Sequence, residues 1–377
     1  MRSLHAAGVD IFARIALWSR GEPLLLTMLG LNLVLGVVDP RPFRDWLQWL
    51  DMPTLASLLA LLVVAQGIRT SGLVQKLARH MLRFMTNRRT LVLVLMGLAA
   101  VSAMLLTNDV SLFLILPLTL ALCEGVALPR VRVVVLVALA VNAGAALSPI
   151  GNPQNLMLWR ASGAGMGHFV AAMAPTVAIM LLVLLAATWW LVKGGALHPI
   201  EPPQQGTRLD VRLGGMSLVL LLVLLGLLQM GLVWWALVLV LVVFGWQRPH
   251  VIGSVDWSLL AIIALMLMGL GHLVEIPFVR AWLGQLDWGH PSVVYVSGIV
   301  LSQAISNVPA TVALLHRAPD PMHLAMAVNI GGSGLAIGSL ANLIALRLEG
   351  SRRIWRTFHL ISVPYLLVVA TLAWWLL

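Results

Sequence analysis

Residues 103–117 read AMLLTNDVSLFLILP, and long apolar runs flank them on both sides. This stretch places Asn108 and Asp109 side by side within strongly apolar sequence. The run at 91–106 and the run after Asp109 are each too short to cross a bilayer comfortably, since two full crossings need about 40 residues. We therefore expect a re-entrant hairpin, which enters a membrane half-way, turns at 107–109 and returns to the same side.

The composition indicates an integral membrane protein. The chain has 377 residues, of which 60% are hydrophobic and 10% are charged, whereas a soluble domain carries roughly 25% charged residues. Its apolar runs are continuous rather than alternating, which favours transmembrane helices. Full spans are expected near 22–38, 53–69, 168–192, 213–230, 232–247, 257–274 and 358–377.

Charge and motifs narrow the class of protein. The net charge of +10 indicates basic cytoplasmic loops that fix the topology, and not a nucleic-acid-binding surface. The single cysteine, Cys123, excludes an internal disulfide and a cysteine-based metal cluster. The sequence carries no phosphate-binding loop, zinc-protease motif or nucleophile-elbow motif. These observations predict no cofactor, no bound metal and no enzymatic activity.

A second interruption follows the first. Residues 137–159 begin as an apolar helical run and then meet Pro149, Gly151 and Pro153. Proline and glycine at this density break a helix. Unwound backbone inside a membrane persists only where protein or a wet cavity satisfies its polar groups. The sequence therefore predicts a broken helix that lines a site.

The same pattern occurs twice along the chain. Residues 140–160 align without gaps to residues 327–347, and the hairpin tip at Asn108 matches Asn307. An internal repeat with interrupted segments at corresponding positions points to a secondary-transporter site near the bilayer midplane. The aligned pairs are Asn142 and Asn329, Gly144 and Gly331, Gly151 and Gly338, Asn155 and Asn342, and Arg160 and Arg347.

The basic residues predict an orientation in the inner membrane. With a cytoplasmic N-terminus, most of the 24 lysines and arginines fall on the cytoplasmic side. The repeats then enter from opposite faces, so they are inverted, and the C-terminus is periplasmic. The exceptions on the outer side are Arg41, Arg44, Arg160, Arg280 and Arg317. The expected segments are an interfacial amphipathic N-terminus (1–21), a first transmembrane repeat (22–193), a cytoplasmic linker (194–212) and a second transmembrane repeat (213–377).

Asp109 is the one acidic residue that this topology places deep in the membrane, where an unpaired carboxylate costs at least a few kcal/mol. Such a carboxylate either caps a helix N-terminus or binds and releases H⁺ or Na⁺ during a transport cycle. We assign Asp109 the coupling role. The predicted substrate- and ion-binding residues surround the tips and breaks: Thr107, Asn108, Asp109, Asn142, Ser148, Gly151, Asn152, Asn155, Ser306, Asn307, Thr311, Asn329, Ser333, Ser339 and Asn342.

The asparagines in this set allow two interpretations. An amide donates and accepts hydrogen bonds, so it suits an oxyanion, a neutral polyhydroxy species or Na⁺. Asparagine side chains also join transmembrane helices to one another, and that structural role is the alternative. His272 and Glu275 lie one helical turn apart near the end of an expected span, where an interfacial position is favoured over a proton relay.

The tip and break sequences resemble the ion transporter superfamily, which includes arsenite permeases, Na⁺/H⁺ antiporters, citrate carriers and dicarboxylate/Na⁺ symporters. The dicarboxylate branch carries Ser-Asn-Thr at both tips, whereas the tips here read Thr-Asn-Asp and Ser-Asn-Val. NDVSLFLILP and IGSLANLIAL are more similar to the arsenite-permease branch and to small bacterial inner-membrane permeases related to it. The resemblance implies an all-α polytopic fold of two inverted repeats, each with a re-entrant hairpin and a broken helix, and a homodimer.

These features predict a secondary active transporter of a small anion or oxyacid, coupled to H⁺ or Na⁺ through Asp109. Its partners would be the small ionic substrate and the lipid bilayer. One alternative is a cation transporter similar to Na⁺/H⁺ antiporters. The alternative from another class is a non-transporting intramembrane enzyme or scaffold, for which Ser148, Ser306 and His272 would be the candidate catalytic groups.

Overall fold

The computed structural model describes residues 22–197 and 209–377 of the chain. The expected interfacial N-terminus (1–21) and most of the expected linker lie outside the described residues. The described part is almost entirely helical and contains no β-strand, only one isolated bridge between Asn87 and Ala196. The prediction of an all-α membrane protein is confirmed.

Seven helices in the described part are long and apolar enough to cross a membrane. They are α4 (Met52–Thr70), α6 (Arg88–Leu105), α7 (Asn108–Gly125), α10 (Met166–Leu191), α11 (Val211–Gln229), α14 (Trp257–Glu275) and α20 (Arg352–Ala373), the last extended by η2 (Trp374–Leu376). Shorter apolar helices are α2 (Pro23–Val38), α12 (Val233–Gln247) and α16 (Pro291–Ile305). The two arms α6 and α7 are longer than expected, and the re-entrant path stays a prediction.

The chain forms two compact units, and the described residues of the first are 22–56 and 256–284. This unit contains α2, α3 (Phe43–Leu47), α14 and α15 (Pro277–Gly284). Helices α2 and α14 pack together, and Asn32 Nδ2 donates to the Leu265 carbonyl oxygen at 2.9 Å. Two segments that are far apart in sequence thus build one unit, so the units differ from the predicted repeat boundaries, which stay a prediction.

The second unit comprises residues 57–255 and 285–377, with a gap at 198–208 in its description. It holds both hairpins and both broken helices, together with most of α4. Its remaining elements are α5 (Leu73–Leu82), α8 (Arg130–Ala145), α9 (Pro153–Ser162), α13 (Pro249–Gly253), α17 (Asn307–Leu314), α18 (Pro321–Gly331), η1 (Ala336–Gly338) and α19 (Leu340–Glu349).

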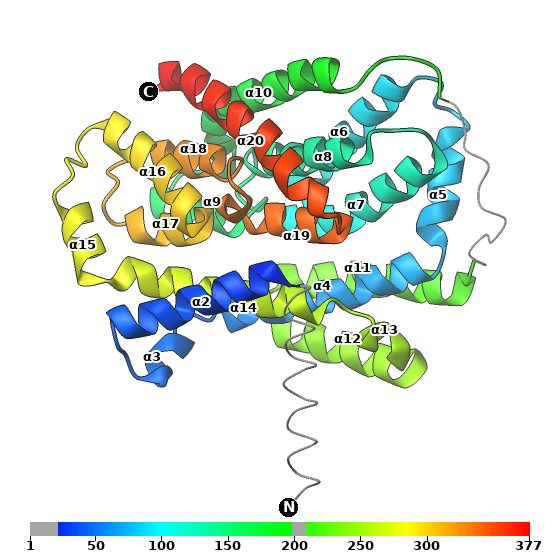
Figure 1. Ribbon diagram of the computed structural model, residues 1–377, viewed down its shortest axis with the longest axis horizontal. Helices are drawn as coiled ribbons and strands as arrows, with labels where there is room; N and C mark the ends of the chain where they lie inside the picture. The colour runs from blue at the N-terminus through cyan, green and yellow to red at the C-terminus, as the bar shows by residue number, and fades with distance from the viewer. Residues whose placement is uncertain (1–21, 198–208) are drawn as a thin grey trace, which may run out of the picture. The chain divides into compact units, whose positions relative to one another are not determined.

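Packing inside the second unit is reciprocal between the two sequence repeats (Figure 1). Helix α6 packs on α8 as α16 packs on α18, and α7 packs on α19 as α17 packs on α9. Likewise α8 contacts both α19 and α20, while α18 contacts both α9 and α10. This exchange of partners is what a two-fold relation between repeats produces. It puts α8 and α18 at the centre, where their side chains from the middle to the end are buried.

Glycine permits the closest of these approaches. A Cβ atom added to Gly144 of α8 would overlap the backbone of Ala100 in α6, and one added to the matched Gly331 of α18 would lie 2.6 Å from the Ser302 side chain in α16. Small residues at such positions let the backbones of transmembrane helices come together. The aligned glycines of the repeat therefore serve helix packing.

Candidate functional site

Both predicted helix breaks are present in the second unit. Helix α8 ends at Ala145 and α9 begins at Pro153, where the Asn152 side chain accepts the Asn155 backbone N–H at 2.8 Å. Helix α18 ends at Gly331, and α19 begins at Leu340 with Ser339 at the capping position. Proline at the start of α9 suits a helix N-terminus, because the missing N–H would have no helical partner there.

Four buried asparagines, which we call the asparagine clasp, tie the two breaks together: Asn142, Asn155, Asn329 and Asn342. Asn142 Nδ2 donates to Asn342 Oδ1 at 2.8 Å. Asn329 Nδ2 donates to Asn155 Oδ1 at 2.6 Å. Because Asn142 aligns with Asn329 and Asn155 with Asn342, these are the same bond made once by each repeat.

The residues that cap α9 and α19 extend this symmetry. Asn152 Nδ2 donates to Asn329 Oδ1 at 2.9 Å, and Ser339 Oγ donates to Asn142 Oδ1 at 3.4 Å. Each cap therefore bonds to the broken helix of the other repeat. The start of α9 is thereby bonded to the end of α18, and the start of α19 to the end of α8.

The clasp also bonds to carbonyl groups at each break. Asn155 Nδ2 donates to the carbonyl oxygens of Ala145, Ala146 and Ser148 at 3.1–3.2 Å. Asn342 Nδ2 likewise donates to the carbonyl oxygens of Gly332 and Leu335, at 2.8 and 3.1 Å. The last carbonyls of a helix have no helical partner, so these amides take that place. The geometry favours the structural interpretation of the four asparagines, and their predicted role in binding stays a prediction.

Removal of a clasp amide should reduce stability, and the loss should depend on whether its hydrogen-bonded partner asparagine is present. We expect Asn342→Ala to lower the free energy of unfolding by about 2–4 kcal/mol, because it removes the hydrogen bonds of Asn342 with Asn142 and with the carbonyl oxygens of Gly332 and Leu335. A double-mutant cycle of Asn142 with Asn342, measured in mixed micelles, should give a larger coupling energy than a cycle of Asn142 with Asn155, which it does not contact through a hydrogen bond. Equal coupling in the two cycles would contradict the clasp.

The first hairpin tip lies against the first break. The Asn108 backbone N–H donates to the Gly151 carbonyl oxygen at 2.8 Å, so α7 begins beside the residues that open α9. Thr107 Oγ1 accepts the Val110 N–H at 3.4 Å, and Asn108 Oδ1 accepts the Asp109 N–H at 2.9 Å. A Cβ atom on Gly151 would overlap the Ala145 backbone, which explains the glycine.

The second hairpin turns at a single residue. Ser306 has φ 71° and ψ 155°, a conformation that other residues than glycine rarely adopt, and it is the one non-glycine residue with positive φ in the described part. Such backbone strain is typical of functional sites. The α17 helix then begins at Asn307, whose carbonyl oxygen accepts the Thr311 hydroxyl at 2.8 Å.

Several buried polar atoms near the breaks have no hydrogen-bond partner among the described residues. They are Asp109 Oδ1, Ser111 Oγ, Ser333 Oγ and both amide atoms of Gln154. Asp109 and Gln154 both lie in the first turns of helices whose starts meet at Gly151. Buried polar groups without partners are rare. Ser148, by contrast, uses its hydroxyl oxygen to accept the Ile150 N–H at 3.3 Å.

Sequence reasoning missed two glutamines here. Gln154 aligns with Ala341, so the repeat gives no signal for it, and only its place between two predicted residues could have indicated it. Gln303 of α16 spans the second break: Nε2 donates to the Gly331 carbonyl oxygen, and Oε1 accepts the Leu335 N–H at 2.6 Å. Gln303 lies in the hairpin arm, outside the aligned tips and breaks.

His272 and Glu275 do not form a pair in the first unit. His272 is fully buried, stacks on Trp49, and its Nε2 atom lies 3.1 Å from Asp39 Oδ2. Glu275 instead forms an ion pair with Arg280. The hydrogen bond from Arg41 holds the pKa of Asp39 below its usual range, with His272 adding to the effect. The proton-relay alternative for His272 and Glu275 finds no support in this geometry.

The starts of α7, α9 and α19 are thus joined to the two breaks by hydrogen bonds. The start of α17 lies against the second break, because a Cβ atom added to Gly332 would come within 2.8 Å of Asn307 Nδ2. Helix N-termini carry partial positive charge and free N–H groups. Paired helix breaks of this kind are typical of polytopic membrane permeases.

Comparison with known proteins gives the family. Residues 15–322 match the citrate transporter family (CitMHS), so the chain belongs to this family of the ion transporter superfamily. Inner membrane protein YbiR of Escherichia coli K12 is 38% identical over 356 residues, which cover 94% of each chain. An uncharacterized transporter of Methanocaldococcus jannaschii is 28% identical over 347 residues, or 89% of this chain and 92% of the relative. The silicon efflux transporter LSI3 of Oryza sativa subsp. japonica is 29% identical over 156 residues, or 40% of this chain and 32% of the relative.

Proposed function

We propose that the chain is a secondary active transporter that moves a small anion or oxyacid across the inner membrane, coupled to H⁺ or Na⁺. The observation that carries the proposal is the set of four helix starts that lie at the two breaks. In transporters with discontinuous helices, half-helix N-termini face the anionic groups of the substrate. The family description names citrate and one relative's name gives silicon as cargo, which supports an anion or an oxyacid.

The unpartnered polar atoms divide the buried polar residues near the breaks into two groups. The clasp asparagines are already bonded to one another, whereas Asp109, Gln154 and Ser333 keep unused polar atoms in the first turns and at the second break. We infer that substrate and coupling ion contact this second group together with the tip residues Asn108 and Asn307. The clasp then fixes the positions of the helix breaks that carry these residues.

A cation transporter similar to Na⁺/H⁺ antiporters is the second candidate. It is favoured by the carboxylate of Asp109, whose Oδ1 atom has no partner among the described residues, because a deep carboxylate suits a cation or a proton relay. We further infer a cytoplasmic N-terminus and a periplasmic C-terminus from the basic residues. A homodimer is inferred from the resemblance alone.

Flux measurements in proteoliposomes test these proposals. The purified chain is given an imposed pH or Na⁺ gradient and is offered carboxylates, arsenite and other oxyanions. We expect saturable uptake of one of these substrate classes until its concentration inside the vesicles exceeds that outside. This accumulation should stop when an ionophore collapses the driving gradient. Protein-free vesicles are the control. Movement of Na⁺ or H⁺ without any anion would instead support the second candidate, and the absence of both would contradict secondary transport.

A further inference from the structure

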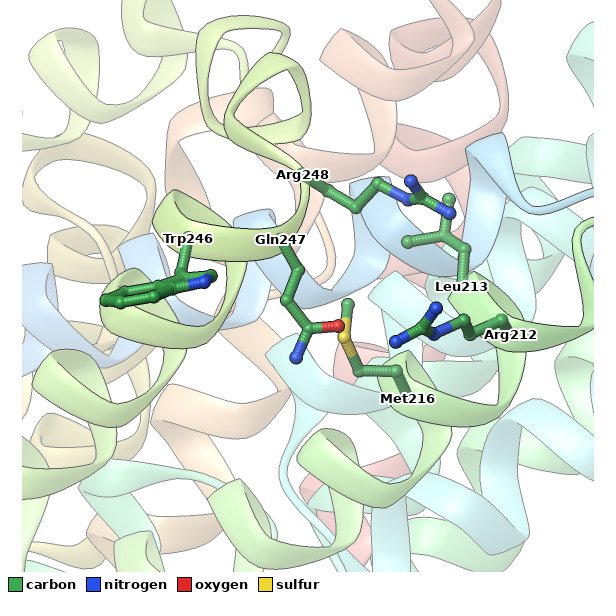
Figure 2. Close-up of a pocket in the computed structure, with 6 residues that line it drawn as sticks. All are labelled: Arg212, Leu213, Met216, Trp246, Gln247 and Arg248. Carbon is green, nitrogen blue, oxygen red and sulfur yellow. The ribbon is translucent and has the colours of Figure 1, made fainter.

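A pocket at one end of α11 and α12 carries arginines that the helix breaks do not use. It has a volume of about 240 Å³ and is lined by Arg212, Leu213, Met216, Trp246, Gln247 and Arg248. Helix α11 begins at Val211 and α12 ends at Gln247, so the pocket lies where one helix starts and its neighbour stops. In Figure 2 the ends of the Arg212 and Gln247 side chains are directed toward Met216, whose thioether lies between them in this view.

The charges in this pocket are unbalanced. Arg248 Nη2 lies 3.0 Å from Asp210 Oδ2 and forms an ion pair with it. The hydrogen bond from the Leu213 backbone N–H, together with Arg248, holds the pKa of Asp210 below its usual range, so this carboxylate stays charged. The exposed Arg212 guanidinium has no ion-pair or hydrogen-bond partner in the described part of the chain. Two guanidinium groups and one carboxylate leave one net positive charge.

The surroundings of the pocket are those of a membrane boundary. Large apolar side chains of α11 and α12, such as Leu222 and Val242, are exposed along the helices. Trp246 is exposed beside the pocket, and Trp234 and Trp235 are exposed at the other end of α12. Tryptophan is enriched at both membrane–water interfaces. The pocket therefore lies at the level of the lipid headgroups.

We propose that this pocket binds the phosphate group of an anionic phospholipid whose acyl chains lie along the exposed apolar face of α11 and α12. Guanidinium groups bind phosphate oxygens through charge-assisted hydrogen bonds, and basic pockets between transmembrane helices hold lipid headgroups. The single net positive charge matches the single negative charge of a phosphodiester such as phosphatidylglycerol. Met216 and Trp246 provide apolar contact below the headgroup, which free phosphate would not use.

The test is a titration of the purified full chain in neutral detergent with phosphatidylglycerol, read by native mass spectrometry. We expect Arg212→Gln to weaken binding of the first lipid about tenfold, as the loss of a hydrogen bond between charged groups implies. Arg352→Gln is the matched control, since Arg352 is exposed at the start of α20 and lies outside the pocket. Gln247→Leu is a second variant that keeps the charge and should also weaken binding.

Phosphatidylcholine and inorganic phosphate are titrated in parallel to identify the source of the phosphate. The proposal requires phosphatidylglycerol to bind the unmodified chain more tightly than either of them. It is overturned if Arg212→Gln and Arg352→Gln bind phosphatidylglycerol equally well, or if phosphatidylcholine binds as tightly. Inorganic phosphate that competes fully with the lipid at similar concentration would assign the pocket to a free anion and would also overturn it.

Discussion

Replacement of Asp109 by Asn is expected to abolish the accumulation of substrate against its gradient and to preserve exchange of substrate at equal concentrations. Asp109 lies in the first turn of α7, with a buried Oδ1 atom that has no partner among the described residues. Asn nearly keeps the size of the side chain but cannot cycle between charged and neutral states. The second repeat has Val308 at the matching position, so coupling should depend on one residue. Both transport modes are measured in the same vesicles under a pH or Na⁺ gradient.

Asp320→Asn is the matched control for this variant. Asp320 also stands at a helix start, where its side chain accepts the Met322 N–H at 2.8 Å, and Asn is an equally good capping residue. It should keep both transport modes. Asp109→Glu, which retains a titratable group, should recover part of the accumulation. If Asp109→Asn accumulates substrate as the unmodified chain does, Asp109 is a helix cap, and the coupling assignment fails.

The second large effect is expected for Gly144→Ala. The added Cβ atom would overlap backbone atoms of Ala100, which cannot rotate away as a flexible side chain could. Helices α6 and α8 would have to separate, so we expect a loss of about 3 kcal/mol or more in the free energy of unfolding. The amount of folded protein extracted from membranes and its denaturation in mixed micelles both measure this loss.

Gly97→Ala provides the contrast within α6. A Cβ atom at Gly97 meets no atom within 4 Å, and alanine is the better helix former by about 0.5–1 kcal/mol. This variant should be as stable as the unmodified chain or slightly more stable. If Gly144→Ala behaves in the same way as Gly97→Ala, the close packing of α6 on α8 is not required for the fold.

The features that sequence predicts well are local or repeated. Pro149, Gly151 and Pro153 locate the first break because they prevent a regular helix whatever surrounds them. The second break follows from the alignment of Asn142 with Asn329. The same alignment selects the four clasp asparagines, because an asparagine that recurs beside the break in both repeats is less expected by chance than one found in a single repeat.

The features that could not be predicted from the sequence depend on contacts between residues far apart along the chain. The sequence pattern of the asparagines is the same whether an amide faces a ligand or another amide. The Asn142–Asn342 and Asn329–Asn155 bonds of the structure distinguish these cases. Helix α6 begins at Arg88, before its apolar run, because Asn87 caps it at 2.9 Å and the Arg89 guanidinium stacks on Trp189 of α10 at 3.7 Å. A hydropathy count excludes such charged residues and therefore underestimates the length of the helix.

The asparagine clasp also has a consequence for biogenesis. Its two central bonds join residues that are 200 and 174 positions apart along the chain. At about 5–20 residues per second of synthesis, the second half of each bond emerges roughly 10–40 s after the first. Until then the nascent N-terminal half resides in the membrane with its broken helix unmatched. A chain truncated before α18 would retain this defect permanently, and membrane quality-control proteases would have an exposed, polar degradation signal by which to recognise it.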